Sequence, residues 1–523
     1  MSEHRSTRSS TGTRRDTARI QPAHDEPLAR DFTAFLGGPM GRFTAPGTAR
    51  LFTPLRVLIC VGLVFLALGW LSKANCISGT AGDDGVFTID WSGSRQFLSA
   101  CYTDIVPLYG NTGLSEGHAP YAHSWTDSDG SRRYTQYPVL ASLLQWVTAL
   151  VARSVAPLVA ATGLPVPAAA VYFSLTAAVL ALFWILVVRS MVSLTGNRVW
   201  DTLLVAASPL IAVHAFTDYD ILAVAAAVGA LLAAARRKPV AAGILIGLGV
   251  AVKLWPLFLL GGYLVLAVRH HRFRPFLTMT GTAVVTWLVV NLPVILIFPD
   301  GWREFLRVGV NRAADWDTVY SVVQRSTGWS GWDHGGPPTV LNTVSGVLFV
   351  VACILIGVFA VRTRRTPRVA EIVFLIVAVF LLVNKVWSPQ HSLWLVPLIV
   401  LALPKWRIVI AWMLSEALLW PVRMWFMAGE DALGAPAGLH GVVVLVRGAL
   451  VIALVVLVVR QMRGRSVDPV LTAHDGVDPL AGDFIPDGDI GSVTGSTTVS
   501  EEPADATAAV SGSVSAKGRS NRG

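Results

Sequence analysis

The stretch ARRKPVAAGILIGLGVAVKLWPLFLLGGYLVLAVRHHRFRP, residues 235–275, decides how this chain folds. The apolar residues between its basic ends could form one long membrane span, since roughly 20 suffice to cross a bilayer. One span would place the two basic ends on opposite sides, against the rule that Lys and Arg gather on the cytoplasmic side. Lys253 also lies in the middle of the run. The pattern therefore predicts two short helices that meet at VKLWP (252–256) and form a hairpin.

The rest of the sequence has the composition of a polytopic membrane protein. Of its 523 residues, 53% are hydrophobic and 14% are charged, whereas about a quarter of the residues in a soluble domain are charged. Long apolar runs alternate with short basic loops, which favours helices over a β-barrel. The net charge of +9 follows from these loops, and no basic stripe predicts a nucleic-acid partner. We expect an all-α, multi-pass protein of the plasma membrane, with the lipid bilayer as its surroundings.

The positions of the basic clusters predict the topology. If every cluster is cytoplasmic, the chain crosses the membrane an even number of times between neighbouring clusters. This predicts about 12 transmembrane helices and two cytoplasmic termini. The outer side then receives a large first loop (73–164), a second large loop (299–338) and turns at 217–220, 384–392 and 423–440. Residues 137–153 are long enough to cross, but a crossing there would reverse every later loop, so we expect them to lie at the outer interface.

Polar, low-complexity segments flank the predicted transmembrane domain (51–463). Residues 1–50 are rich in Arg, Ser, Thr and Gly, and residues 464–523 are acidic and rich in Gly, Ser and Thr. Such segments cannot bury enough apolar surface to fold alone. Both are expected to be disordered cytoplasmic tails.

The first outer loop contains two of the four cysteines, Cys76 and Cys101. An outer loop lies in an oxidising compartment, so a disulfide between them is expected. It would hold Asp104, three residues further on, close to the end of the first span. The common nucleotide, zinc and serine-hydrolase motifs are missing from the sequence, and we expect neither a metal nor a cofactor.

Several motifs occur in a characteristic order along residues 50–460. They are YTDIVPLY (102–109), GHAPY (117–121), YPVL (137–140), HAFTDYDILAVA (214–225), GILIGLGVAVKLWPLFLL (243–260) and NKVWSPQHSLWLVPL (384–398). In this order they resemble the actinobacterial polyprenol-phosphate-mannose-dependent mannosyltransferases of GT-C fold. The chain is most similar to the alpha-1,2-mannosyltransferase-related integral membrane proteins, which are like glycosyltransferase family 87.

The resemblance implies an enzyme that moves a sugar, most simply mannose, from a polyprenyl-phosphate donor to a glycan or glycolipid acceptor of the cell envelope. The reaction would take place on the outer face and invert the anomeric centre. In such relatives an aspartate of the first outer loop is the general base, and Asp104 matches its position. The lipid phosphate is a good leaving group, so the chemistry needs a carboxylate for the acceptor hydroxyl and cations for the phosphate.

The other candidate residues would bind the substrates. They are the cations Lys253, Lys385, Arg325 and Arg423, the polar residues His391, Gln390 and Tyr137, and the acidic pair Asp218 and Asp220. Lys253 and Lys385 match lysines in the corresponding loops of the relatives, although lysines at such positions can also simply reach for lipid headgroups. Asp104 has a structural alternative as a helix cap, and Asp218 and Asp220 are rival bases.

Other functions also fit a polytopic chain. A transporter or flippase would have a similar number of crossings, but no internal repeat is visible and the polar residues gather at the tips of predicted hairpins. A relative that transfers arabinose, or a degenerate member that acts as a scaffold, fits the same motifs.

Overall fold

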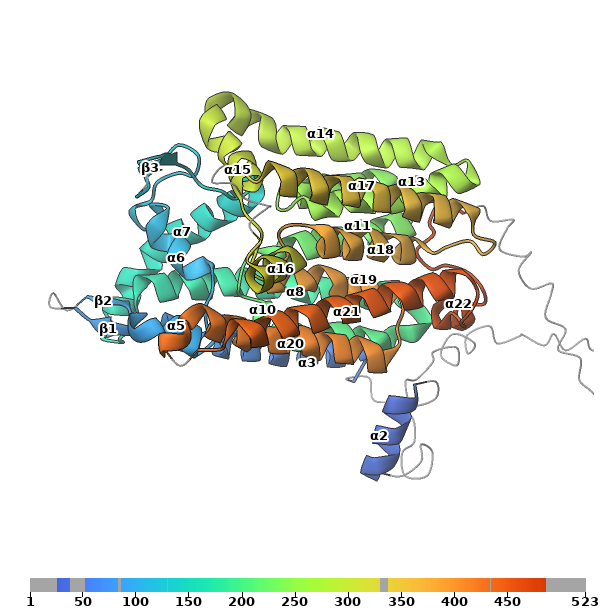
Figure 1. The fold of residues 1–523 in the computed structure, drawn as a ribbon, viewed down its shortest axis with the longest axis horizontal. Coiled ribbons are helices and arrows are strands. Elements are labelled where there is room, and N and C mark those ends of the chain that lie inside the picture. Colours follow the sequence, from blue (N-terminus) through green and yellow to red (C-terminus); the bar gives the residue numbers. More distant parts are fainter. Residues whose placement is uncertain are drawn as a thin grey trace, which may run out of the picture.

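The computed structural model is a bundle of helices that run along the long axis of the molecule (Figure 1). The structure describes residues 26–37, 52–82, 86–128, 130–329, 337–432 and 434–485. Within these ranges, seven helices are long and apolar enough to span a membrane: α3 (Pro54–Leu71), α7 (Val139–Ala160), α8 (Ala168–Leu194), α14 (Phe273–Ile297), α17 (Thr339–Arg362), α20 (Trp406–Ala428) and α21 (Ala437–Met462). The all-α, membrane-spanning fold class is therefore confirmed.

Three hairpins of shorter helices occupy the middle of the bundle. The first rises through η3 (Gly196–Thr202), α9 (Leu203–Ala206) and α10 (Pro209–His214), and returns as α11 (Asp220–Ala235). The second consists of α12 (Pro239–Val250), η4 (Trp255–Leu257) and α13 (Phe258–His270). The third consists of α18 (Val369–Val383), η5 (Pro389–Trp394) and α19 (Leu395–Ala402).

The second hairpin is the one predicted from residues 235–275. Its helices break at residues 251–257, around Lys253, and its two far ends meet again, because Pro239 and His271 line the same cavity. The third hairpin closes in the same way. The side chain of Arg368 donates hydrogen bonds to the carbonyl oxygens of Leu401 and Ala402, both at 2.6 Å.

A pair of glycines lets the second hairpin pack tightly on α14. A Cβ atom added at Gly243 would lie 2.3 Å from the Met279 carbonyl oxygen, and one at Gly247 would lie 2.5 Å from that of Ala283. The spacing of four residues puts both glycines on one face of α12, the arrangement that lets membrane helices approach closely. A larger side chain at either position would push the hairpin away from α14.

One end of the bundle, here called the loop end, carries most of the irregular structure. The first loop contributes α4 (Ala74–Ile77), η1 (Ser92–Ser94), α5 (Arg95–Leu98), α6 (Ile105–Asn111), η2 (Leu114–Glu116) and two small antiparallel pairs, β1 (Gly79–Ala81) with β2 (Phe87–Ile89) and β3 (Trp125–Thr126) with β4 (Arg132–Arg133). Later segments add α15 (Pro299–Asn311), α16 (Val319–Thr327) and η6 (Glu430–Ala432).

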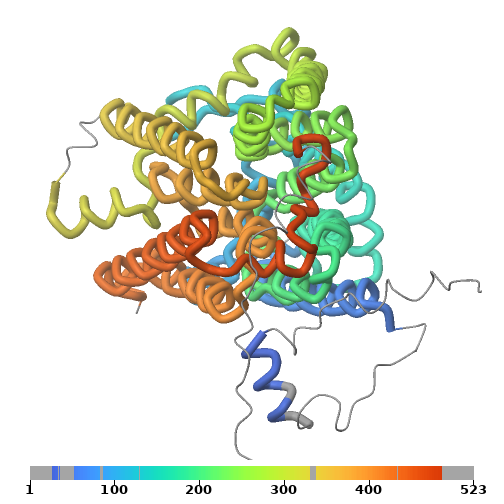
Figure 2. The backbone as a smooth tube through the Cα atoms, turned by 90° about the vertical axis from the view of Figure 1, so that its right-hand side faces the viewer, coloured from blue at the N-terminus to red at the C-terminus, as the bar shows by residue number. Residues whose placement is uncertain are grey.

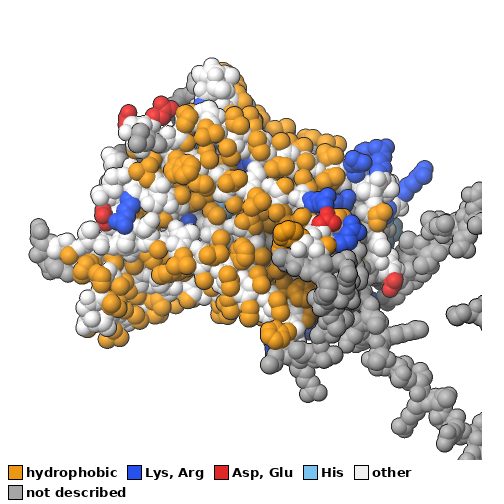
Figure 3. All heavy atoms as spheres, turned by 90° about the horizontal axis from the view of Figure 1, so that it is seen from below, with side chains coloured by type: hydrophobic (Ala, Val, Ile, Leu, Met, Phe, Trp, Pro, Cys, Tyr) orange, Lys and Arg blue, Asp and Glu red, His pale blue; other side chains and the backbone are white. Residues whose placement is uncertain are grey.

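The opposite end, here called the basic end, carries the Arg-rich turns at 235–239, 269–275 and 362–368 and the segment 460–465. Between the two ends, hydrophobic side chains cover most of the visible surface, and Lys and Arg gather towards its right-hand end (Figure 3). In helices α14 and α17, only 11% of the residues in the most apolar 18-residue stretch are buried. This apolar surface is what a protein in contact with lipid requires.

Helix α7 contains the segment 137–153, which we expected at the outer interface. It packs along the first loop: the Tyr121 hydroxyl bonds Ser142 Oγ (3.0 Å), and Trp146 Nε1 donates to the Gly117 carbonyl oxygen (3.4 Å). By length and composition α7 could also cross a membrane. Its interfacial position and the count of about 12 crossings stay predictions, and the three hairpins turn inside the bundle rather than beyond it.

Parts of the expected tails are folded. In the N-terminal tail, residues 27–37 form helix α2 (Pro27–Gly37), and Asp31 pairs with Arg407 at 3.3 Å. Residues 464–485 contain α22 (Pro469–Ala473) and cross the basic end from α21 to the green helices in Figure 2. The prediction of a disordered tail from residue 464 is therefore wrong for 464–485. The remaining tail residues, 1–25, 38–50 and 486–523, lie outside the described residues.

Charge pairing explains why the segment after α21 folds. Asp468 pairs with Arg368 (Nε to Oδ2, 2.8 Å) and with Arg365, and it also caps α22. Phe484 is buried and packs its ring 4.8 Å from that of Tyr263. The sequence contained one signal for this packing. The segment after residue 464 is acidic, and the predicted loop at 362–368 is basic, so their charges could pair.

Candidate active site

The tips of the three hairpins meet beneath the first loop and enclose a cavity of about 560 Å³. The hairpin tips contribute residues 217–219, 252–255 and 384–391, α15 contributes Phe305, Val308 and Gly309, and α20 contributes residues near its end. Eight of the ten predicted site residues line this cavity: Asp104, Tyr137, Asp218, Lys253, Lys385, Gln390, His391 and Arg423. Helix α7 begins at this cavity, directly after Tyr137.

Asp104 precedes α6 and is fixed by its neighbours in the chain. Its backbone N–H donates to the Thr217 carbonyl oxygen (2.9 Å), and the Thr103 hydroxyl donates to that of Phe216 (2.7 Å). A disulfide joins Cys76 to Cys101, the predicted pair, with Cα atoms 5.6 Å apart. The first loop is thus tied both to the end of α3 and to the tip of the first hairpin.

The carboxylate of Asp104 accepts a hydrogen bond from the Tyr102 hydroxyl (Oη to Oδ1, 2.9 Å) and makes no cap bond to its helix. Burial, with the negative charge of Asp218 nearby, raises the pKa of Asp104 to about 6. The Tyr102 hydrogen bond, Arg423 and Lys253 oppose this shift. A carboxylate with such a pKa is ionised at neutral pH and is a better proton acceptor than an ordinary aspartate.

A buried lysine that the sequence reasoning missed lies behind Asp104. Lys73 Nζ donates to the Tyr102 carbonyl oxygen (2.9 Å) and lies 4.6 Å above the Trp420 ring. Burial lowers the pKa of Lys73 to about 7, although Asp104 acts in the opposite direction. Lys73 comes just after the first apolar run, where a lysine normally reaches into the headgroup layer, so its burial could not be predicted from the sequence.

Lys253 is held between the two aspartates that were considered as rival bases. Its Nζ donates to Asp218 Oδ2 (3.0 Å) and Asp220 Oδ1 (2.7 Å), and Trp394 Nε1 donates to the same Asp220 oxygen (2.6 Å). Burial alone would lower the pKa of Lys253, but the two carboxylates outweigh it and raise that pKa. The positive charge of Lys253 is already balanced within the protein. Asp220 contributes through this pair and is not itself a lining residue.

Lys385 fastens the tip of the third hairpin to the segment after α15. Its Nζ donates to the carbonyl oxygens of Val310 (3.1 Å) and Arg312 (2.7 Å), and its own carbonyl accepts from the Asp315 N–H (2.8 Å). This lysine therefore holds the backbone of the segment that carries Arg312, a residue of the cavity lining.

Two arginines bring positive charge to the cavity. Arg423 lies 3.0 Å from Asp317 and 3.6 Å from Asp315. Arg312 lies 3.8 Å from Asp315, and half of its side chain is exposed. Arg312 was not predicted as a site residue, because only the folding of residues 299–318 over the hairpin tips shows that it faces the cavity.

Arg325, which we expected to bind substrate, lies outside the cavity lining. Its guanidinium contacts His440 Nδ1 (3.1 Å) and stacks 5.0 Å from the Phe426 ring. His440 Nε2 in turn bonds Asp317 Oδ1 (2.9 Å). Arg325 thus supports the partner of Arg423, since the second outer loop folds so that α16 packs on α21.

Several buried polar atoms around the cavity are not paired within the described part of the chain. They are Asp218 Oδ1, Gln390 Oε1 and His391 Nδ1. The His391 ring stacks on Trp394 with centroids 4.4 Å apart, and Trp394 stacks on Trp255 at 5.5 Å. Buried polar atoms normally have partners. Here a polar ligand with several hydroxyl groups would supply them.

Comparison with known proteins finds a family that is similar to the middle of the chain. Residues 134–389, just under half of the sequence, match the family described as Glycosyltransferase family 87. No curated protein matches the chain. Among solved structures, that of ArnT from Cupriavidus metallidurans bound to undecaprenyl phosphate is 15% identical, with a TM-score of 0.36 over 79% of this chain and 78% of that chain. The family match includes the first two hairpin tips and ends within the third, so this part of the multi-pass membrane protein is similar to a glycosyltransferase family.

Proposed function

We propose that this protein is a glycosyltransferase that moves a sugar, most simply mannose, from a polyprenyl-phosphate donor to a glycan or glycolipid of the cell envelope. The observation that carries the proposal is the cavity itself, which combines the carboxylate of Asp104 with the guanidinium groups of Arg312 and Arg423. The basic end would face the cytoplasm by the positive-inside rule, so the cavity would open on the outer face of the plasma membrane.

The reaction requires one carboxylate and one anion-binding group. Asp104 takes the proton of the acceptor hydroxyl as that oxygen forms its bond to the anomeric carbon. The bond from the anomeric carbon to the phosphate oxygen breaks, and the polyprenyl phosphate leaves with both bonding electrons. Arg312 meets the negative charge that grows on this phosphate, with Arg423 behind it. Attack from the side opposite to the phosphate inverts the anomeric centre.

A lipid donor fits the walls of the cavity. Leu254, Phe305 and Met427 line the cavity and are 50%, 38% and 37% exposed. These apolar residues would let a polyprenyl chain leave the cavity towards the bilayer. The unpaired atoms of Asp218, Gln390 and His391 suit the hydroxyl groups of a sugar, because a polar ligand that pairs them is favoured over one that does not.

The test uses purified protein in lipid nanodiscs and donors labelled in the sugar. We expect label to pass from polyprenyl-phosphate mannose to a membrane glycolipid extract, and no transfer from GDP-mannose, which has no polyprenyl chain. Polyprenyl-phosphate arabinose is tested in parallel, because an arabinose-transferring protein would use this donor instead of the mannose donor. If sealed liposomes move the intact donor across the bilayer while its sugar–phosphate bond stays unbroken, the protein is a flippase and the proposal is wrong.

A further inference from the structure

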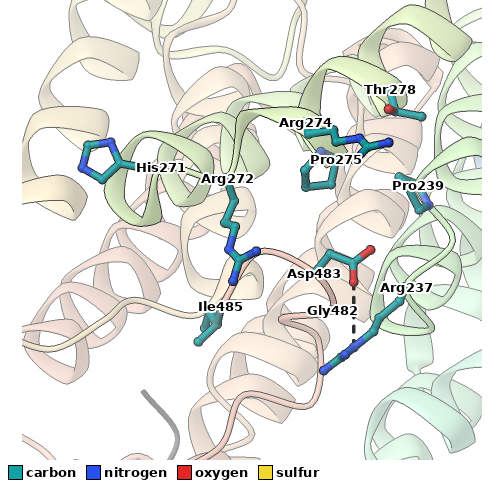
Figure 4. A pocket seen from close by; sticks show the side chains of 10 residues that line it. All are labelled: Arg237, Pro239, His271, Arg272, Arg274, Pro275, Thr278, Gly482, Asp483 and Ile485. Atoms are coloured by element: carbon teal, nitrogen blue, oxygen red, sulfur yellow. Dashed lines mark ion pairs between the residues drawn. The ribbon is translucent and has the colours of Figure 1, made fainter. Parts of the chain in front are cut away.

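A second cavity, of about 450 Å³, lies at the basic end, at the opposite end of the bundle from the hairpin tips. Three separate segments build it: the turn between α11 and α12, the start of α14 and the end of the C-terminal segment (Figure 4). Gly482 has a left-handed backbone (φ +56°), and a Cβ atom there would lie 2.1 Å from the Ala234 carbonyl oxygen. The close approach at Gly482 brings the C-terminal segment into the cavity wall.

The cavity has an excess of positive charge. Arg237, Arg272 and Arg274 line it, and the one acidic residue in its lining, Asp483, lies 3.9 Å from Arg237. The guanidinium groups of Arg272 and Arg274 form no hydrogen bond or ion pair with any residue that the structure describes, and both residues are exposed. In Figure 4 both side chains extend along the cavity wall, while His271 points to one side. Within the described part of the chain, two guanidinium groups therefore remain without an anionic partner.

The cavity borders the apolar surface of the bundle. Pro239 and Thr278 line it, and the next residue along α12, Val240, and the residue before Thr278, Leu277, are 49% and 64% exposed. Exposed apolar residues continue from Leu277 along α14 to Ile297. A ligand with an anionic head and apolar tails would fill the cavity and cover this surface, whereas a soluble anion would use the head position alone.

We propose that this cavity binds the phosphate headgroup of an anionic membrane phospholipid, with its acyl chains along α12 and α14. Guanidinium groups suit phosphate because their paired N–H donors match its oxygens. Basic cavities between membrane helices attract anionic headgroups for the same reason. The lipid fastens the C-terminal segment at 482–485 to the second hairpin. This site is independent of the proposed transfer reaction, since its residues lie at the opposite end of the bundle.

The test is native mass spectrometry of the full-length, detergent-solubilised protein with added phosphatidylglycerol or phosphatidylcholine. We expect one phosphatidylglycerol to be retained and phosphatidylcholine to bind much more weakly. The double variant Arg272→Gln, Arg274→Gln should weaken phosphatidylglycerol binding about 30-fold, because each arginine near an anionic lipid contributes several-fold in affinity. The variant Arg272→Lys, Arg274→Lys keeps the charge and should recover part of the binding.

The matched control is Arg460→Gln, Arg465→Gln, which removes the same charge from two exposed arginines of the basic end that do not line the cavity. It should retain the lipid. If the control loses phosphatidylglycerol as strongly as the cavity variant, only the general charge of this end attracts lipid and the proposal is wrong. It is also wrong if inorganic phosphate raises the unfolding temperature as much as phosphatidylglycerol does, since the site would then take a free anion. The unfolding temperature of each variant without lipid shows that it is folded.

Discussion

Asp104→Asn is the most informative change, because it separates catalysis from folding. Asparagine keeps the size of the side chain and can still accept the 2.9 Å hydrogen bond from the Tyr102 hydroxyl. It cannot take a proton from the acceptor. Loss of a general base lowers turnover by roughly 10²–10⁴, and we expect a loss of this size with donor binding retained, since the phosphate is met by arginines.

The same change should not destabilise the protein. Burial raises the pKa of Asp104 from 3.8 to about 6, and a shift of about 2 units corresponds to at most about 3 kcal/mol. An acid with a raised pKa loses stability as the pH rises from its unfolded to its folded pKa. The wild-type protein therefore loses this free energy of unfolding between about pH 4 and pH 6, and Asp104→Asn avoids that loss. At pH 7 the variant should unfold at the same temperature as wild type or higher.

The assay measures transfer at saturating donor from pH 5 to pH 8, alongside thermal unfolding of the same samples. Wild-type turnover should fall as the pH drops through about 6, because Asp104 is then protonated. Asp300→Asn is the control, since Asp300 is an aspartate of the loop end whose side chain is 75% exposed. It should leave turnover unchanged. Near-normal turnover in Asp104→Asn would refute the assignment of the base, and a lowered unfolding temperature would show that Asp104 is structural.

Three further predictions test other parts of the site and fold. Arg312→Ala should raise the donor KM and lower kcat together, each by about tenfold, because this cation would meet the phosphate before and during transfer; an unchanged KM in steady-state kinetics would exclude that role. Cys76→Ser should lower the free energy of unfolding by about 3 kcal/mol, as expected for a bridge that closes 25 residues, and chemical denaturation that shows no change would contradict it. In intact cells, an impermeant thiol reagent should label a cysteine at Ala313 and not one at His271; the reverse labelling would place the cavity on the cytoplasmic face.

The sequence predicted the parts of the site that depend on the course of the backbone. Basic residues on both sides of Lys253 were enough to predict a hairpin there, because charge decides on which side a segment ends. The residues of the three hairpin tips were selected through the order of their motifs, and the structure brings the tips to one cavity. Both arguments use features that are visible along the chain, without knowledge of which helices are neighbours.

The pairing of charges could not be predicted in this way. Lys253 was expected as a cation for phosphate, yet two carboxylates from the neighbouring hairpin balance it. Arg312 reaches the cavity only because α15 folds over the hairpin tips, and Arg325 misses it because α16 packs on α21. Which charges meet depends on contacts between distant segments. The sequence lists the charged residues but does not state their partners.

The short hairpins would also set the depth in the bilayer at which the proposed chemistry takes place. Helices α11 and α12 have 16 and 12 residues, so they rise only about 24 and 18 Å from the basic end, while the hydrocarbon layer is about 30 Å thick. If the basic end lies at the cytoplasmic boundary, the floor of the cavity lies several ångströms below the far boundary of that layer. The phosphate of the proposed lipid donor would be held near this boundary by its own chain. In the proposed reaction, bilayer thickness would therefore set how well donor and arginines line up, and we expect lipids with longer or shorter acyl chains to alter the rate without any change in the protein.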